Sequence, residues 1–206
     1  MAGTDLQTRL VNLAFSMIEH DARLTSLDDD GSDADRARQA WPVAFGECLE
    51  ALDWAFARRI GITSPISGVP TNPDKPFASA LPGDCVRVRR VTNPTSVSWR
   101  VYGREIHADC DGQLTITFTV SPPSTAGFSG GFQAAMVPLL AYYLAPGFTR
   151  SQNRAEIYFR KYGEKLDAAA LVEAQENGDD SAFDFDGSAG LTTLTSPAGG
   201  SYPGSY

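Results

Sequence analysis

The apolar residues of this 206-residue chain change their spacing twice along the sequence. Near the N-terminus they recur at helical intervals, whereas "DCVRVRRV" and "SVSWRVYG" alternate apolar and polar residues as strands do. Helical spacing returns at "FQAAMVPLLAYYLA" and continues in the segment that follows. A chain with this order places strands between two groups of helices. We therefore expect an α+β fold, mainly an α-helical bundle with an inserted antiparallel β-sheet lobe.

Four helices are expected, two on each side of the strands. Their predicted ranges are residues 5–20, then from Ser32 or Asp33 to 58, 132–145 and 150–177. Capping-box pairs stand at the start of the first and the last helix, namely Thr4 with Gln7 and Thr149 with Gln152. Kinks are expected at Pro42 and Pro138, because proline lacks the N–H that the helix interior needs.

Between the helix pairs the chain first passes through a proline-rich stretch, residues 60–82, which is expected to be a long ordered loop or a link between lobes. Four strands follow and are expected to form an antiparallel meander. Within "DCVRVRRV", strict alternation places Val86 and Val88 on one face and Arg87 and Arg89 on the other. The dipeptide "DG" at 111–112 is a hairpin signal that joins "GREIHAD" to "GQLTITFTV".

These elements divide the chain into four parts: residues 1–60 with the N-terminal helices, 61–122 with the loop and the β lobe, 123–178 with the C-terminal helices, and 179–206 as an extended C-terminal tail. The tail, "DDSAFDFDGSAGLTTLTSPAGGSYPGSY", is too rich in Gly, Ser, Thr and Pro to form a core of its own. Apolar anchors are nevertheless spaced along it, and we interpret them as partner-binding residues: Phe183, Phe185, Leu191, Leu194, Tyr202 and Tyr206. The alternative is an ordinary frayed terminus.

The composition of the chain limits the classes of function that it can have. The hydrophobic content of 42% supports a core, and the net charge of −8 argues against a general nucleic-acid coat, which needs an excess of Lys and Arg. The sequence contains neither a long uncharged apolar run nor a signal-peptide pattern, so a reducing cytoplasm is expected.

Three widely spaced cysteines lack zinc-ligand spacing, and Cys48 and Cys85 are expected to act as small hydrophobes. Trp41, Trp54 and Phe56 of the second helix are expected in the core.

Several motifs that form catalytic or metal sites in other proteins are incomplete in this sequence. "GFSGG" fits G-x-S-x-G around Ser129, but no strand runs directly into it and both histidines, His20 and His107, precede it. We interpret it as the glycine-rich entry to a helix. Two acidic stretches resemble calcium loops, yet their twelfth positions are Ala37 and Thr193 rather than glutamate. No catalytic residue, cofactor or metal is expected, and His107 is interpreted as an ordinary strand histidine.

Arginines are concentrated in the β lobe of this otherwise acidic protein. The residues that we take as candidates for docking an acidic partner or a neighbouring subunit are Arg87, Arg89, Arg100 and Arg104. The alternative is a solvated strand face. The tail anchors and these arginines are the two candidate interaction sites of the chain.

The order of elements, with "CLEALDWAFARR", "ALPGDCVRVRRV", "WRVYGREIHADCDGQLTITFTV" and "FQAAMVPLLAYYLA" in sequence, resembles the head-to-tail connector (adaptor) proteins of tailed bacteriophages, a group that includes tail tubular protein A and the helical portal adaptors. The resemblance covers about residues 6–175 and contains no catalytic signature. Pro138, the proline-rich loop and the extended tail depart from it.

The resemblance implies a twelve-membered ring of copies below the portal protein, in the neck of a virion assembled in the host cytoplasm. The ring would extend the DNA conduit and contact the next tail or stopper protein, and DNA would pass through without specific binding or any membrane contact. Negative charge repeated around such a ring would repel phosphates and let the duplex slide. Two alternatives remain open: a DNA-binding packaging factor that uses the arginine-bearing sheet, and a small serine hydrolase that uses Ser129.

Overall fold

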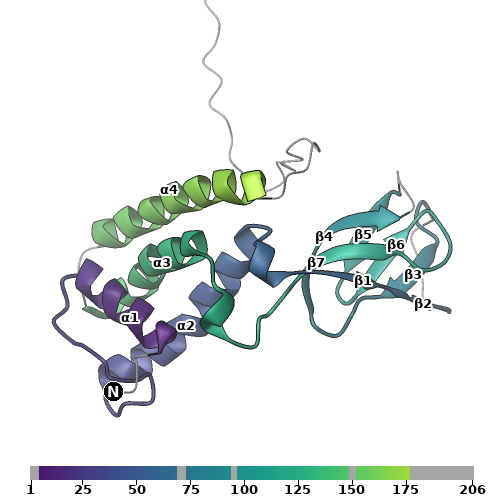
Figure 1. Ribbon diagram of the computed structural model, residues 1–206. Coiled ribbons are helices and arrows are strands. Elements are labelled where there is room, and N and C mark those ends of the chain that lie inside the picture. Colours follow the sequence, from purple (N-terminus) through teal and green to yellow (C-terminus); the bar gives the residue numbers. More distant parts are fainter. Residues whose placement is uncertain (1–4, 69–72, 94–96, 149–151, 177–206) are drawn as a thin grey trace, which may run out of the picture.

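The computed structural model describes residues 5–68, 73–93, 97–148 and 152–176, which form a helical body and a β lobe lying side by side (Figure 1). The body consists of α1 (Leu6–Met17), α2 (Ser32–Ala51), α3 (Gly130–Phe148) and α4 (Gln152–Glu176). The lobe consists of β1 (Arg58–Ile62), β2 (Ser64–Ile66), β3 (Phe77–Ala80), β4 (Cys85–Asn93), β5 (Trp99–Tyr102), β6 (Glu105–Ala108) and β7 (Thr115–Val120). Two short 3-10 turns, η1 (Ala55–Ala57) and η2 (Thr125–Gly127), connect them. The predicted fold class, helices with an inserted antiparallel β lobe, is confirmed.

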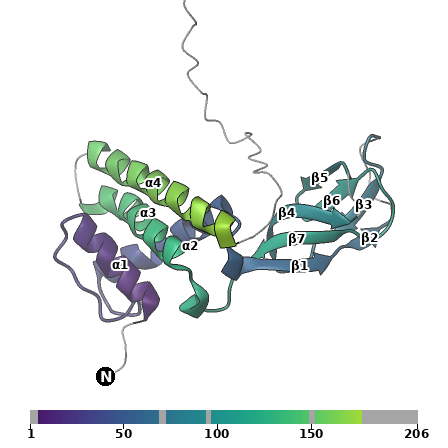
Figure 2. The ribbon, with the colours of Figure 1, turned by 45° about the horizontal axis from the view of Figure 1, so that its top comes forward.

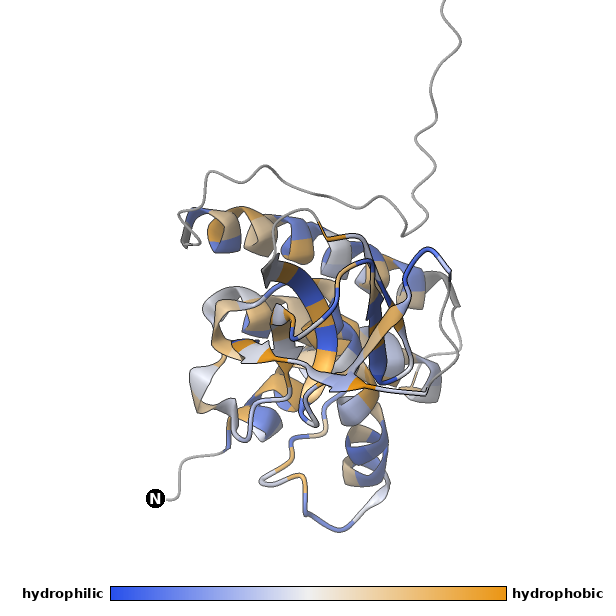
Figure 3. Cartoon of the chain, turned by 90° about the vertical axis from the view of Figure 1, so that its right-hand side faces the viewer, coloured by the Kyte–Doolittle hydropathy of each residue, from blue (hydrophilic) through white to orange (hydrophobic). Residues whose placement is uncertain are grey.

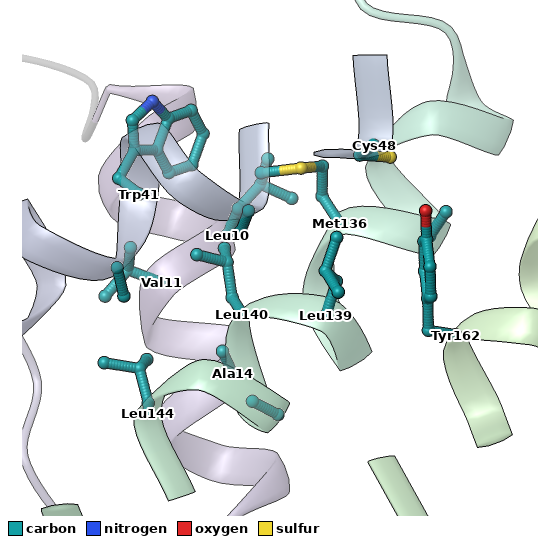
Figure 4. Packing of buried hydrophobic residues seen from close by; sticks show 14 of the residues in the cluster. Leu10, Val11, Ala14, Trp41, Cys48, Met136, Leu139, Leu140, Leu144 and Tyr162 are labelled. Atoms are coloured by element: carbon teal, nitrogen blue, oxygen red, sulfur yellow. The ribbon is translucent and has the colours of Figure 1, made fainter. Parts of the chain in front are cut away.

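Helix α3 is the centre of the body. Nearly every face of it is apolar, and its buried residues include Phe132, Met136 and Leu140. The other three helices surround it, as Figure 4 shows for Leu10 of α1 and Tyr162 of α4, which point toward α3 from different sides. Because α3 buries side chains all round, its sequence lacks the polar stripe of a surface helix.

The helices of the described residues match the predicted ones in number and order; α2 ends seven residues before its predicted end, and the other ends differ by at most three residues. Pro42 and Pro138 lie inside continuous helices. Helix α2 starts at Ser32, the residue before it is Gly31, and no side-chain oxygen accepts a backbone N–H as a cap at this end. The capping boxes predicted at Thr4 and Thr149 lie outside the described residues.

Two sheets with separate strand orders form the lobe. One has the order β1-β7-β4 and the other β2-β3-β6-β5, and all pairs are antiparallel (Figure 2). Their inner faces share a second core that is separate from the helical one and includes Cys85, Ile106, Ile116 and Phe118. Cys48 and Cys85 are both buried free thiols, as expected for small hydrophobes. Figure 3 views the molecule from the side of the lobe.

The predicted four-strand meander is wrong. Of the predicted neighbours, β5 and β6 do form a hairpin, but β6 and β7 belong to different sheets. Gly112 does have a φ of 98°, so a turn exists at the "DG" signal, but it leads the chain from one sheet to the other. The predicted loop at 60–82 contains most of β1, all of β2 and all of β3. Pro65 fits there because β2 is an edge strand, which tolerates a missing donor.

The predicted alternation in β4 is also wrong. Its register with β7 shifts three times, between Cys85 and Arg87, between Val88 and Arg90, and between Val91 and Asn93. Each shift is a bulge that inserts one extra residue, so inward positions recur every three residues instead of every two. Cys85, Val88 and Val91 therefore contact the lobe core, whereas Val86 is 40% exposed.

Candidate functional site

The junction between body and lobe is where most candidate residues meet. Helix α2 ends at Ala51, seven residues before the predicted end, and Leu52 is already extended. Its last turn contains no basic residue, so its terminal carbonyls need partners from elsewhere. Trp54 lies beyond the helix, fully buried, and its indole Nε1 donates to the Cys48 carbonyl at 2.8 Å.

Arg87 and Arg89 of β4 satisfy further carbonyls of the same helix end. Arg87 Nη1 donates to the Glu50 carbonyl at 2.9 Å, and Arg89 Nη2 donates to the Leu49 carbonyl at 3.1 Å and also to that of Leu52. Positive charge is favourable here because the C-terminal end of a helix carries partial negative charge. These two arginines thus fasten the lobe to the body.

Arg89 is the more enclosed of the pair. Its Nε donates to the Thr119 hydroxyl of β7 at 2.7 Å. Burial, and then the nearby charge of Arg87, lower the pKa of Arg89 to about 10, which leaves the guanidinium charged at neutral pH. Asp53 lies close by, pairs with Arg58 Nε at 3.0 Å, and partly offsets that effect.

The other two candidate arginines lie away from the junction. Arg104, in the turn between β5 and β6, donates to the carbonyls of Cys85 and Pro82. Arg100 is exposed on β5, in the other sheet from Arg87 and Arg89. The four arginines predicted as one docking surface are therefore not gathered on one face, and three of them bind main-chain carbonyls of their own chain.

Ser129 immediately precedes α3, and its hydroxyl contacts a carboxylate. The Phe132 N–H donates to Ser129 Oγ at 3.3 Å, which makes Ser129 an N-cap, and the hydroxyl donates to Glu173 Oε1 at 3.4 Å. The other carboxylate oxygen, Oε2, accepts the Ala55 N–H at 2.9 Å. Glu173 is 6% exposed, so this carboxylate joins α4 to the starts of α3 and η1.

Neither histidine lies beside Ser129. His20 Nε2 is 3.0 Å from Asp33 and its ring packs on Phe148, whereas His107 Nε2 is 3.2 Å from Glu105 on the same strand. The serine is therefore not arranged as a nucleophile with an imidazole base. His107 is more buried than an ordinary strand histidine, at 5% exposed, and its Nδ1 has no hydrogen-bond partner within the described part of the chain.

Sequence reasoning missed Glu173, although a signal was present. Helical spacing places it on the same stripe of α4 as Tyr158, Tyr162 and Ala169, which are all buried. A carboxylate on an apolar stripe predicts a buried partner. Asp53 carried no comparable signal, because only the tertiary fold brings it close to Arg89 of β4.

The remaining candidate sites are the acidic loops and the tail anchors. Within the described ranges, no group of three or more potential ligands is arranged to hold a metal ion. In the first acidic loop, Asp29 Oδ2 accepts the N–H groups of Thr25 and Ser26. The tail anchors Phe183, Phe185, Leu191, Leu194, Tyr202 and Tyr206 lie outside the described residues.

Comparison with known proteins adds no relative. A scan against protein-family models finds no match, and a search of curated proteins finds none either. Among the helices of the described residues, none has both the length and the apolar character that crossing a bilayer requires.

Proposed function

We propose that this protein is a structural head-to-tail adaptor of a phage or phage-like particle. The observation that carries the proposal is the arrangement of the chain: two helices, an inserted β lobe and two further helices, in the order that the connector resemblance implies. In this role the protein forms a ring below the portal, catalyses no reaction and provides a passage for DNA.

The two-part shape suits a ring. Closed rings need two different lateral surfaces on each copy, and a helical body beside a lobe provides them. The charges are also unevenly divided. Residues 1–57 contain four Lys or Arg and eleven Asp or Glu, whereas residues 58–120 contain eight and five. A net charge of −7 on one part and +3 on the other favours contact between the body of one copy and the lobe of the next.

Three of the four candidate docking arginines have an indirect role in this proposal. Arg87, Arg89 and Arg104 bind carbonyls of their own chain, so they support docking by holding the lobe in position. Arg100 remains the candidate for direct contact with a neighbour or a lower ring. The tail anchors remain the candidates for contact with the portal or an adjacent copy.

Cryo-microscopy of particles from a culture that makes the protein tests this proposal. The expected result is a ring of copies at the neck, between the portal and the tail or stopper, with open density along its axis. Finding the protein in the head shell, in the tail tip or absent from purified particles would contradict it.

A binding assay separates the adaptor from the packaging-factor alternative. Purified protein is titrated with duplex DNA at low and at high salt. An adaptor that lets DNA slide should bind weakly at both, whereas tight binding that weakens steeply with salt favours the packaging factor. Hydrolysis of ester or peptide substrates that is lost in Ser129→Ala would instead favour the hydrolase.

A further inference from the structure

Strand β1 presents an open edge. It pairs with β7 on one side only, and in Figures 1 and 2 it runs along one margin of the lobe. Ile60 and Ile62 are 70% and 60% exposed, the most exposed large aliphatic side chains among the described residues of the lobe. An open edge with exposed apolar side chains is a template for another strand.

The hydrogen-bond pattern shows which main-chain groups point outward. The Thr63 N–H donates to the Leu114 carbonyl at 2.9 Å, so these two residues form a hydrogen-bonded pair. In an antiparallel ladder such pairs alternate with non-bonded ones, and the register pairs Ile62 with Thr115 and Ile60 with Thr117. The N–H and C=O groups of Ile60 and Ile62 therefore point away from β7, and no group in the described part of the chain bonds them.

The other three sheet edges are blunted. β4 has three bulges, and its Arg87 and Arg89 turn onto α2. β2 has only three residues and contains Pro65, and β5 has four residues and presents the exposed Arg100. These are devices that discourage strand addition. On β1, by contrast, both charges are neutralised, because Arg58 pairs with Asp53 and Arg59 with Asp84.

The C-terminal tail contains one segment suited to this edge. Within residues 177–206, the run 191–195, "LTTLT", is the longest stretch made only of threonine and aliphatic residues, which favour strands over the Gly, Ser and Asp around them. The whole tail contains four aspartates and no Lys or Arg, a charge of −4, and the lobe carries +3. Main-chain bonds would provide the affinity of such an added strand, and the isoleucines would provide packing.

The tail also starts in the right place. Glu173 binds the Ala55 N–H, and η1 leads directly into β1, so the last turn of α4 lies beside the start of β1. Figure 1 shows this end of α4 toward the lobe. The fourteen residues 177–190 precede the run, and when extended they span roughly 46–50 Å. That reach exceeds what a return to the adjacent β1 requires.

We propose that residues 191–195 of one copy add as a strand to the free edge of β1 in the next copy. The choice of a second copy rests on the ring of the proposed function. The strand joins neighbours head to tail, because the donor segment and the acceptor edge are different surfaces of the same chain. It also covers Ile60 and Ile62, which share one face of β1; because side chains alternate along a strand, one of Leu191 and Leu194 lies on that face and the other on the opposite face.

Disulfide trapping in the full-length chain tests the proposal. Two single variants, Ile60→Cys and Thr193→Cys, are prepared with one of them isotopically labelled, mixed, oxidised and mapped by mass spectrometry. The matched control replaces Ile60→Cys with Val86→Cys, an exposed position on the opposite edge of the same sheet. The expected product joins residue 60 of one copy to residue 193 of the other, and it is lost with the Val86 control.

A double variant, Ile60→Cys with Thr193→Cys, separates the two sources of the strand at high dilution. A bond within one chain there, with no mixed product in the first experiment, would overturn the proposal in favour of the chain's own tail. No product, or as much product with Val86→Cys, would overturn docking at β1. Mass photometry of the same samples measures ring formation independently: rings without the 60–193 product would refute this inference alone, and the product without rings would refute the ring.

Discussion

Glu19 is the only non-glycine residue with a left-handed backbone in the described part of the chain, with φ of 60°. It follows α1, and two hydrogen bonds define its turn. The Glu19 N–H donates to the Ser16 carbonyl at 3.2 Å and the His20 N–H to the Phe15 carbonyl at 2.9 Å. This pattern is a Schellman motif, in which the left-handed position is usually glycine because a Cβ there is unfavourable.

We expect Glu19→Gly to be more stable than Glu19→Ala by about 1 kcal/mol, because both variants lose the carboxylate but only glycine relieves the backbone. Urea unfolding of the two variants measures the difference. Equal stabilities would show that the Cβ at position 19 is not strained.

The second residue-scale prediction concerns the hydrogen bonds by which Arg89 of β4 binds carbonyls at the end of α2. Replacing Arg89 by methionine removes the charge that binds the carbonyls of Leu49 and Leu52, and we expect a loss of about 2–3 kcal/mol. Arg100→Met, at an exposed position of the other sheet, should change stability by less than about 0.5 kcal/mol. Chemical denaturation of both variants compares them, and a similar small effect of each would mean that Arg89 is a solvated surface charge. We therefore expect the reversal of Arg87 and Arg89 to glutamate to destabilise the folded monomer, because both side chains bind carbonyls at the end of α2.

At the scale of elements, α2 and α3 are joined by a polar contact. The Tyr143 hydroxyl of α3 donates to Glu47 Oε2 of α2. This bond, and then burial, raise the pKa of Tyr143 to about 12 from its ordinary value of 10. Tyr162 of α4 also has a raised pKa, because burial disfavours its charged form.

A raised phenol pKa makes stability depend on alkaline pH. The folded state holds the Tyr143 proton more tightly than the unfolded state, so its contribution is complete below pH 10 and is lost as the pH rises toward 12. We expect Tyr143→Phe to reduce the fall in unfolding free energy between pH 9 and pH 11. Denaturation at several pH values provides the measurement, and parallel curves for the parent and Tyr143→Phe would contradict it.

At the scale of the whole molecule, each part has its own core. Buried residues of the four helices form one cluster, and those of the two sheets form the other. Two stretches of chain and the two arginines of β4 connect them, and Glu173 joins the last turn of α4 to the same place. The position of the lobe is therefore set by polar contacts at the junction and not by a shared apolar core.

This organisation predicts the effect of removing the residues after Asn177. Both cores lie within the described residues, so the truncated protein should keep the circular dichroism spectrum and the melting temperature of the parent. If the tail binds the portal or a neighbour, the same truncation should prevent the joining of tails to filled heads. Full complementation of assembly by the truncated protein would mean that the tail anchors Phe183, Phe185, Leu191 and Leu194 have no role in docking.

The sequence alone determined the types and the order of the main elements, because helical and alternating spacing are local and survive whatever packs against them. The four helices, the hairpin of β5 and β6, and the burial of Cys48 and Cys85 followed from it. The tertiary structure decided what depends on distant partners. β4 is bulged, so its side chains do not alternate, and β6 and β7 separate into two sheets. α2 ends at Ala51, and Trp54, Arg87 and Arg89 bind its last carbonyls, so two of the predicted docking arginines hydrogen-bond to their own chain while Arg87 stays exposed. No local pattern encodes such contacts, since hydrogen-bond partners separated by more than thirty residues meet only when the whole chain has folded.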